Sequence, residues 1–166
     1  GIAAEAAACM AGFTPALAAK LLGAFARAGL RMPSLLAAAA KAVLAADLSV
    51  GFAAGGAGAP GADAGIDISQ LAWSFAKQGW TDGRVFARLA GEALRRGVDR
   101  MAPGSVSAMA WALATAEYQE PRLAAAAARA AVERWASFRS REAAQLALAL
   151  ARGAQGCSEA APFFAC

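Results

Sequence analysis

A six-residue apolar block occurs three times in this sequence at nearly constant spacing. The three copies are Leu71–Ala76 (LAWSFA), Met109–Ala114 (MAWALA) and Leu146–Ala151 (LALALA). The third residue of the block advances by 38 residues from Trp73 to Trp111, and by 37 residues from there to Leu148. A period of this length is typical of stacked supersecondary units, each of which buries its apolar face against its neighbours. We therefore expect one helical-repeat domain over residues 1–166 rather than a globular fold around one central core.

The units are predicted to be helix–turn–helix pairs. The expected fold class is all-α, an α-solenoid of about three and a half repeats of ~38 residues. Alanine, which dominates the composition, has the highest helix propensity, and Pro15, Asp82 and Pro121 are typical of helix starts. First helices are predicted near 15–28, 67–78, 105–116 and 141–151, and second helices near 34–46, 83–96 and 121–136.

A fainter copy precedes the three blocks and is separated from them by an insertion. Leu21–Gly29 aligns with Leu71–Gly79. The excess length falls in the Gly- and Ala-rich segment 51–65, which is predicted to be a flexible surface loop. The units then run roughly over 13–50, 66–100, 101–137 and 138–166. Residues 2–10 and 159–166 resemble half-units, so the sequence leaves open whether the array extends beyond this chain.

The third residue of each block, called the anchor below, is set apart from the apolar face of its helix. The anchors are Gly23, Trp73, Trp111 and Leu148. In every unit apolar residues lie five, two and one positions before the anchor and two after it, which is one face of a helix. That face is expected to pack on the second helix of the same unit. Trp73 and Trp111 point about 150° away from it, so we predict that they pack between neighbouring units. Use of the rings as base-stacking platforms is the less favoured alternative.

Polar side chains occupy another face of the first helices, three residues before the anchor and four after it. In chain order these positions hold Lys20, Arg27, Gln70, Lys77, Ala108, Thr115, Gln145 and Arg152. Stacked units would align them as a ladder, in which Lys and Arg hold phosphates and Gln and Thr contact base edges. The alternative is a solvent-exposed strip of polar side chains, and Ala108 offers no hydrogen bond to a base.

A second basic group lies at the end of the predicted helix 83–96 and just beyond it. It consists of Arg95, Arg96 and Arg100, and one unit later the corresponding stretch holds Arg134, Arg139 and Arg141. Cations at a helix C-terminus interact favourably with the helix dipole, which is sufficient to explain the group. The same side chains would also form a basic edge able to contact phosphates. The net charge of +4, from 16 basic and 12 acidic residues, is only a mild bias.

No catalytic residue, metal ligand or cofactor is predicted. The sequence contains no histidine, which excludes Ser-His and Cys-His nucleophile systems. Cys9, Cys157 and Cys166 are far apart in the sequence, so no clustered zinc ligands are expected. Gly56–Gly61 matches GxGxxG but has no βαβ unit around it, as a dinucleotide site requires. The longest uncharged run, Met101–Ala116, is short and contains a proline, so we expect no membrane insertion.

The units resemble octotricopeptide repeats and the related helical repeats of RAP-domain and FAST-kinase-like proteins. The residues that carry the resemblance are Ile68–Gly79 (ISQLAWSFAKQG), Met101–Pro103 and Ala110–Thr115, which are similar to that family's proline-then-LxxxxWAxA pattern. Gly23 and Leu148 stand where the pattern has tryptophan, so the outer units match less well. The resemblance implies an α-solenoid in a mitochondrion or chloroplast that binds organellar mRNA or rRNA, in some members as a ribosome subunit. No RAP domain is visible, so no nuclease-like activity is implied. No targeting segment is visible either, so the organellar setting is implied by the resemblance alone.

Two classes of function stay open on the sequence. The first is non-catalytic binding of single-stranded or ribosomal RNA through the ladder on the first helices, within a ribonucleoprotein or another large assembly. The second is a protein–protein interaction scaffold in a larger complex, with no direct RNA contact. Neither requires a small-molecule substrate, and we expect no enzymatic activity. The identity of the RNA or protein partner, and the choice between mitochondrion and chloroplast, are not encoded in these patterns.

Overall fold

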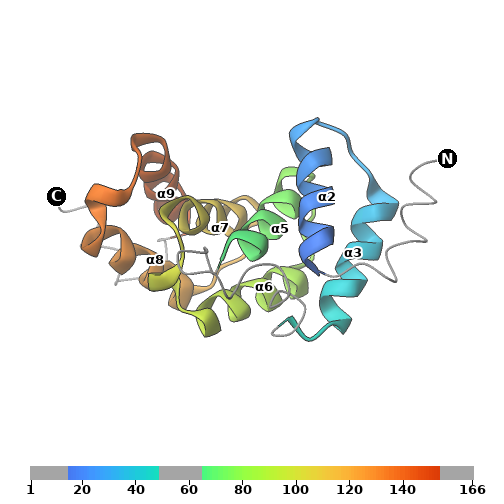
Figure 1. The fold of residues 1–166 in the computed structure, drawn as a ribbon, viewed down its shortest axis with the longest axis horizontal. Helices are drawn as coiled ribbons and strands as arrows, with labels where there is room; N and C mark the ends of the chain where they lie inside the picture. Colours follow the sequence, from blue (N-terminus) through green and yellow to red (C-terminus); the bar gives the residue numbers. More distant parts are fainter. Residues whose placement is uncertain (1–14, 49–64, 154–166) are drawn as a thin grey trace.

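The computed structural model describes residues 15–48 and 65–153, and over these ranges it consists of helices joined by short turns (Figure 1). The first helices of the units are α2 (Pro15–Arg27), α5 (Ile66–Lys77), α7 (Pro103–Thr115) and α9 (Ser140–Gly153). The second helices are α3 (Pro33–Ala45), α6 (Gly83–Arg96) and α8 (Pro121–Glu133), with the 3-10 turns η3 (Val98–Arg100) and η4 (Trp135–Ser137) after α6 and α8. The all-α class is confirmed.

The predicted helix bounds are close to the observed ones, with one difference at the end of α8. The helix expected to reach residue 136 ends at Glu133 and is followed by the 3-10 turn η4. The predicted starts are confirmed: Asp82 accepts a hydrogen bond from the backbone N–H of Arg84 (3.0 Å), and Pro121 lies in the first turn of α8. The predicted half-units, and the predicted loop apart from Gly65, lie outside the described residues.

The same backbone turn ends three of the first helices. Six residues after the anchor the chain adopts a positive φ, at Gly29 (70°), Gly79 (81°) and Glu117 (56°). One residue further, the N–H groups of Leu30, Trp80 and Tyr118 donate to the carbonyls of Phe25, Phe75 and Leu113, at 3.0, 2.9 and 3.0 Å. A left-handed residue that closes a helix with a bond of this span is a Schellman motif. The hairpin turn is therefore repeated in register in three successive units.

Glu117 adopts the left-handed conformation that glycine adopts in the two equivalent turns, and this has a measurable consequence. In this conformation the Cβ of an L-residue lies close to the following carbonyl oxygen, which raises the free energy of the folded state. We expect Glu117→Gly to raise the free energy of unfolding by about 0.5–1 kcal/mol, after the larger chain entropy of unfolded glycine is subtracted. Gly79→Ala, whose added Cβ has Arg31 Nη2 3.9 Å away as its nearest neighbour, should lower it by about 1 kcal/mol. Denaturant unfolding of both variants measures these changes, and equal signs would contradict the shared turn.

The helices form two layers (Figure 1). In one layer α2, α5, α7 and α9 lie side by side in chain order, and each packs closely on the next. In the other layer α3, α6 and α8 each lie against the first helix of their own unit and against the preceding or following second helix. The expected apolar face of the first helices is fully buried in α5 and α7, and partly exposed in α2 and α9, which end the layer.

Small side chains allow the first helices to approach one another closely. Gly23 of α2 faces Gln70 of α5, and a Cβ built on Gly23 would lie 2.5 Å from Gln70 Nε2. Between α7 and α9, the buried Ser107 donates its hydroxyl hydrogen bond to the Glu142 carbonyl (2.9 Å). At this boundary the anchor Gly23 thus faces Gln70, which lies three residues before the next anchor, Trp73.

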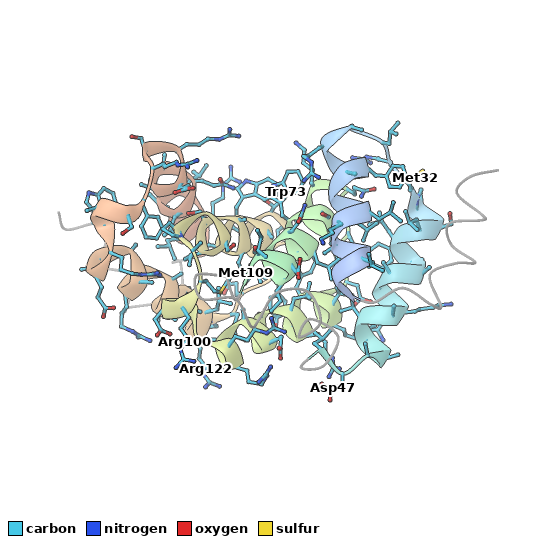
Figure 2. All side chains as sticks on the ribbon, viewed as in Figure 1. Met32, Asp47, Trp73, Arg100, Met109 and Arg122 are labelled. Atoms are coloured by element: carbon cyan, nitrogen blue, oxygen red, sulfur yellow. The ribbon has the colours of Figure 1, made fainter. Side chains whose placement is uncertain are left out.

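The tryptophan anchors meet across the boundary between two units. The ring centroids of Trp73 in α5 and Trp111 in α7 are 6.3 Å apart, and the rings are tilted by 38°. The predicted contact between units is therefore confirmed. The contact does not bury the rings fully, because both stay partly exposed. Figure 2 shows the reason: Trp73 lies on the side of α5 away from α6, where the second layer does not cover it.

Candidate nucleic-acid interface

An open groove of about 810 Å³ crosses the layer of first helices and receives residues from four of its elements. We call it the first-helix groove. Its charged, aromatic and amide-bearing lining residues are Arg27 from α2, Gln70 and Trp73 from α5, and Arg139, Arg141, Glu142 and Gln145 from the start of α9 and the residue before it. Ser69, Ser105 and Ala108 also line it. The groove is thus a composite of three successive unit boundaries.

One row of the predicted ladder is brought together in this groove. Gln70, Ala108 and Gln145 all lie three residues before their anchors, and all three line it. Each is partly buried, because the preceding first helix packs beside it. For Gln70 the neighbour is Gly23, whose missing side chain leaves room for the amide. Two hydrogen-bonding side chains therefore point into one depression from different units, with an alanine between them.

The other row of the ladder is divided by the structure. Arg27, four residues after its anchor, lines the groove, whereas Lys77, Thr115 and Arg152 at the equivalent positions are exposed outside it. Arg27 belongs to the last turn of α2 and lines the groove from the side of that helix. Lys20, in the first row, is also exposed and does not line the groove. These four candidates stay on the surface of the first helices without sharing one site.

Three residues of the groove were not part of the predicted ladder. Trp73 was predicted to pack between units, with base stacking as the less favoured alternative, and Arg139 and Arg141 were predicted to form a basic edge able to contact phosphates. For Trp73 the available signal was its position off the apolar face of its helix, which leaves the ring exposed wherever the next helix does not cover it. No signal indicated that the two arginines would share a groove with Arg27, because these residues come from the first and fourth units.

Positive charge predominates along the groove. The guanidinium groups of Arg27, Arg139 and Arg141 are exposed, and Glu142 supplies the one carboxylate in the described lining. That carboxylate is already engaged: Oε2 accepts the backbone N–H of Arg139 (2.9 Å), and Oε1 would lie 3.1 Å from a Cβ at Gly104. It therefore sits near the starts of α7 and α9, where helix dipoles favour an anion. The lining carries a net charge of about +2 by this count of side chains.

The second basic group has structural partners. Arg95 and Arg96 both bind the buried Glu92, with Nη2–Oε1 and Nε–Oε1 distances of 2.6 and 2.7 Å. Arg96 also donates from Nη2 to the carbonyl of Leu48 (3.2 Å), which ties α6 to the segment after α3. Arg100 is exposed and lies near Arg122 at the edge of the molecule opposite Trp73 (Figure 2). The group is therefore separate from the first-helix groove, and two of its three members stabilise the fold.

Ionisation of Glu92 contributes to stability with a definite pH dependence. Burial opposes the charged form, but the hydrogen bonds from Arg95 and Arg96 outweigh it and hold the pKa of Glu92 below its usual 4.5. A carboxyl whose pKa is lowered by folding stabilises the fold above its unfolded-state pKa, and loses that contribution as the pH falls through its folded-state pKa. We expect the melting temperatures of the wild type and Glu92→Gln to differ most near neutral pH and to converge as the pH falls below the usual carboxyl pKa of 4.5. A difference that is constant with pH would contradict this role.

The described residues and the comparisons with known proteins place further limits on the site. Over residues 15–48 and 65–153, no three His, Cys, Asp or Glu side chains are grouped as a metal site requires. Cys9, Cys157 and Cys166 lie outside those ranges. In the same part of the chain, every helix is too short or too polar to cross a bilayer.

The chain matches no protein-family model and no curated protein sequence. The resemblance to octotricopeptide repeats therefore rests on the residues and spacing quoted above.

Proposed function

We propose that this protein is a non-catalytic RNA-binding α-solenoid, and that it holds single-stranded RNA in the first-helix groove. The observation that carries the proposal is the groove itself, in which Trp73 lies between arginines from opposite ends of the layer. A basic groove with an aromatic ring is the combination by which proteins bind single strands, because it engages phosphates and bases at once. A duplex presents its bases only at groove edges, and the face of a base is then not available.

Three features support the repeat organisation within this proposal. The hairpin turn recurs in register at Gly29, Gly79 and Glu117. The first helices pack on their chain neighbours, as units in a one-dimensional array do. The equivalent positions Gln70, Ala108 and Gln145 share one surface. About three and a half units of ~38 residues would then present one continuous binding face.

The charges of the groove support this face as the binding surface. Ion pairs engage Arg84 with Asp82, and Arg95 and Arg96 with Glu92. The groove, by contrast, is lined by the exposed side chains of Arg27, Arg139 and Arg141. The one carboxylate in its described lining, Glu142, accepts the backbone N–H of Arg139 next to the start of α9. An arginine fork matches a phosphate with two parallel hydrogen bonds, so these side chains suit a ribose–phosphate backbone.

The resemblance to octotricopeptide repeats supports an organellar setting for this activity. In a mitochondrion or chloroplast the bound RNA would be a transcript or a segment of rRNA, and in the second case the protein would be part of a ribosome. Crosslinking from cells followed by sequencing of the attached RNA separates these cases. Fragments that map to one organellar transcript or to rRNA support the proposal, and recovery of no RNA contradicts it.

A salt titration with purified protein tests the binding mode. We expect labelled ten-nucleotide oligouridylate to bind more tightly than a duplex of the same length, by fluorescence anisotropy. Because single strands lose about 0.7 counterions per neutralised phosphate, three arginine contacts should give a slope of about −2 for log K against log salt. A slope near zero, or equal affinity for the duplex, would refute binding of single strands in a basic groove.

An interaction scaffold is the second candidate, and one observation favours it. Apolar side chains are exposed at the end of the array formed by α8, η4 and α9, where Val132 is 55% exposed, Trp135 58% and Leu148 51%. Exposed apolar groups that lie near one another are typical of contact surfaces between proteins. Copurification of a defined protein partner that survives nuclease treatment, together with no RNA binding in the titration above, would select this function instead.

A further inference from the structure

Trp73 differs from the other side chains of the first-helix groove in offering an aromatic surface. We infer that this ring is a stacking platform for one nucleobase of the bound strand, flanked by arginines that hold the adjoining phosphates. The inference rests on the proposed RNA-binding function and adds the atoms that contact a base. Stacking on an aromatic side chain tolerates every base, because each base has a π face.

The ring is held in place before any ligand arrives. Trp111 in the next unit lies against it, with centroids 6.3 Å apart and planes tilted by 38°, a separation within the range of favourable aromatic pairs. Trp111 itself does not line the groove, so it supports Trp73 from outside the lining. A platform that is already fixed loses little side-chain entropy when a base stacks on it.

Packing between units does not by itself require a tryptophan at the anchor position. The equivalent anchors are Gly23, which is buried between α2 and α5, and Leu148, which is half exposed on α9. The same backbone position thus accommodates hydrogen or an aliphatic chain elsewhere in this protein. The large ring is present on α5, which together with α7 supplies eight of the residues that line the groove.

The surroundings of the ring suit a nucleotide. Gln70 precedes Trp73 by three residues on α5, so both lie on one side of that helix and line the same groove. Its amide offers both a donor and an acceptor for a base edge. Arg27 lines the groove from the α2 side, and Arg139 and Arg141 line it from the α9 side. A strand that crosses the first helices would place phosphates on both sides of the stacked base.

The experiment compares Trp73→Leu, Trp73→Phe and Trp135→Leu. Leucine is the residue that the chain itself uses at the equivalent anchor 148, and phenylalanine keeps an aromatic face. Trp135 is more exposed than half but does not line the groove, so its variant is the matched control. Each protein is titrated with ten-nucleotide oligoadenylate and with an abasic ribose–phosphate strand of the same length, by anisotropy and by quenching of tryptophan fluorescence.

We expect Trp73→Leu to weaken oligoadenylate binding about tenfold and to remove most of the quenching, because one stacked base is lost. Trp73→Phe should retain most of the affinity, and Trp135→Leu should bind as the wild type does. The abasic strand should bind the wild type and Trp73→Leu equally, which also shows that the leucine variant keeps its groove. An equal loss for both strands would overturn the stacking role and assign Trp73 to the fold.

The results also separate this inference from the function on which it depends. If Trp73→Leu binds oligoadenylate as tightly as the wild type, with the quenching intact, stacking on Trp73 is wrong while RNA binding stands. If the wild type binds neither strand, both the proposed function and the stacking platform are wrong.

Discussion

Reversal of the three groove arginines, Arg27, Arg139 and Arg141, to glutamate should weaken binding of oligouridylate by about 100-fold or more. Like charges placed against each other at an interface cost several kcal/mol, and each reversal also removes a phosphate contact. The slope of log K against log salt should fall from about −2 towards zero, since no counterions are then released at the groove. Anisotropy titrations at several salt concentrations measure both effects, and the circular dichroism of the variant checks its helical content.

Two control variants with comparable changes decide where the RNA lies. Arg100, Arg122 and Arg129 are exposed outside the groove, and their reversal alters the net charge by the same amount. Lys20, Lys77 and Arg152 belong to the predicted ladder but do not line the groove, and they form the second control. We expect each control to retain affinity within about threefold at physiological salt, where the Debye length is about 8 Å. A larger loss in either control than in the groove variant would move the binding surface to that face.

Removal of the Phe86 side chain should have the largest effect on stability. Phe86 is fully buried on α6, which contacts α3, α5 and α8, so its ring fills space between both layers. Phe86→Ala should lower the free energy of unfolding by about 3–5 kcal/mol, from lost burial and from the cavity left behind. Small domains are stable by only about 5–15 kcal/mol, so this is a large fraction of the total.

Phe25→Ala is the matched control for that change. Phe25 is half-buried on α2 at the end of the layer, so water replaces part of its surroundings and less of the transfer energy is lost. We expect less than half the effect of Phe86→Ala, measured by denaturant unfolding of both variants. Equal losses at the two sites would show that the layers do not pack around Phe86 as described.

Much of the fold follows from patterns that act over short distances along the chain. The seven α-helices of residues 15–48 and 65–153, and the starts at Asp82 and Pro121, were predicted because capping, proline geometry and alanine propensity are local properties. The buried face of α5 and α7 was predicted because helical periodicity assigns each residue to a side. The end of α8 was placed three residues too late, where the chain continues as a 3-10 turn of similar local geometry.

The candidate site was predicted only in part. Gln70, Ala108 and Gln145 were placed on a common surface from spacing alone, and the structure brings them into one groove. That Arg27 lines the same groove as Arg139 and Arg141 was not predicted, since these residues come from the first and fourth units. Arg95 and Arg96 were offered as phosphate contacts, and no local pattern showed that their partner Glu92 would be buried.

The sequence alone predicted the helices, their starts and the face that each first helix buries, because these depend on backbone preferences and on the 3.6-residue period. It also placed Trp73 and Trp111 off that face. Only the tertiary structure decided which polar residues share a groove with Trp73, because this depends on how neighbouring first helices fit together, for example where Gly23 leaves room for Gln70. That fit is made by side chains of different helices, so it is not a property of any one helix.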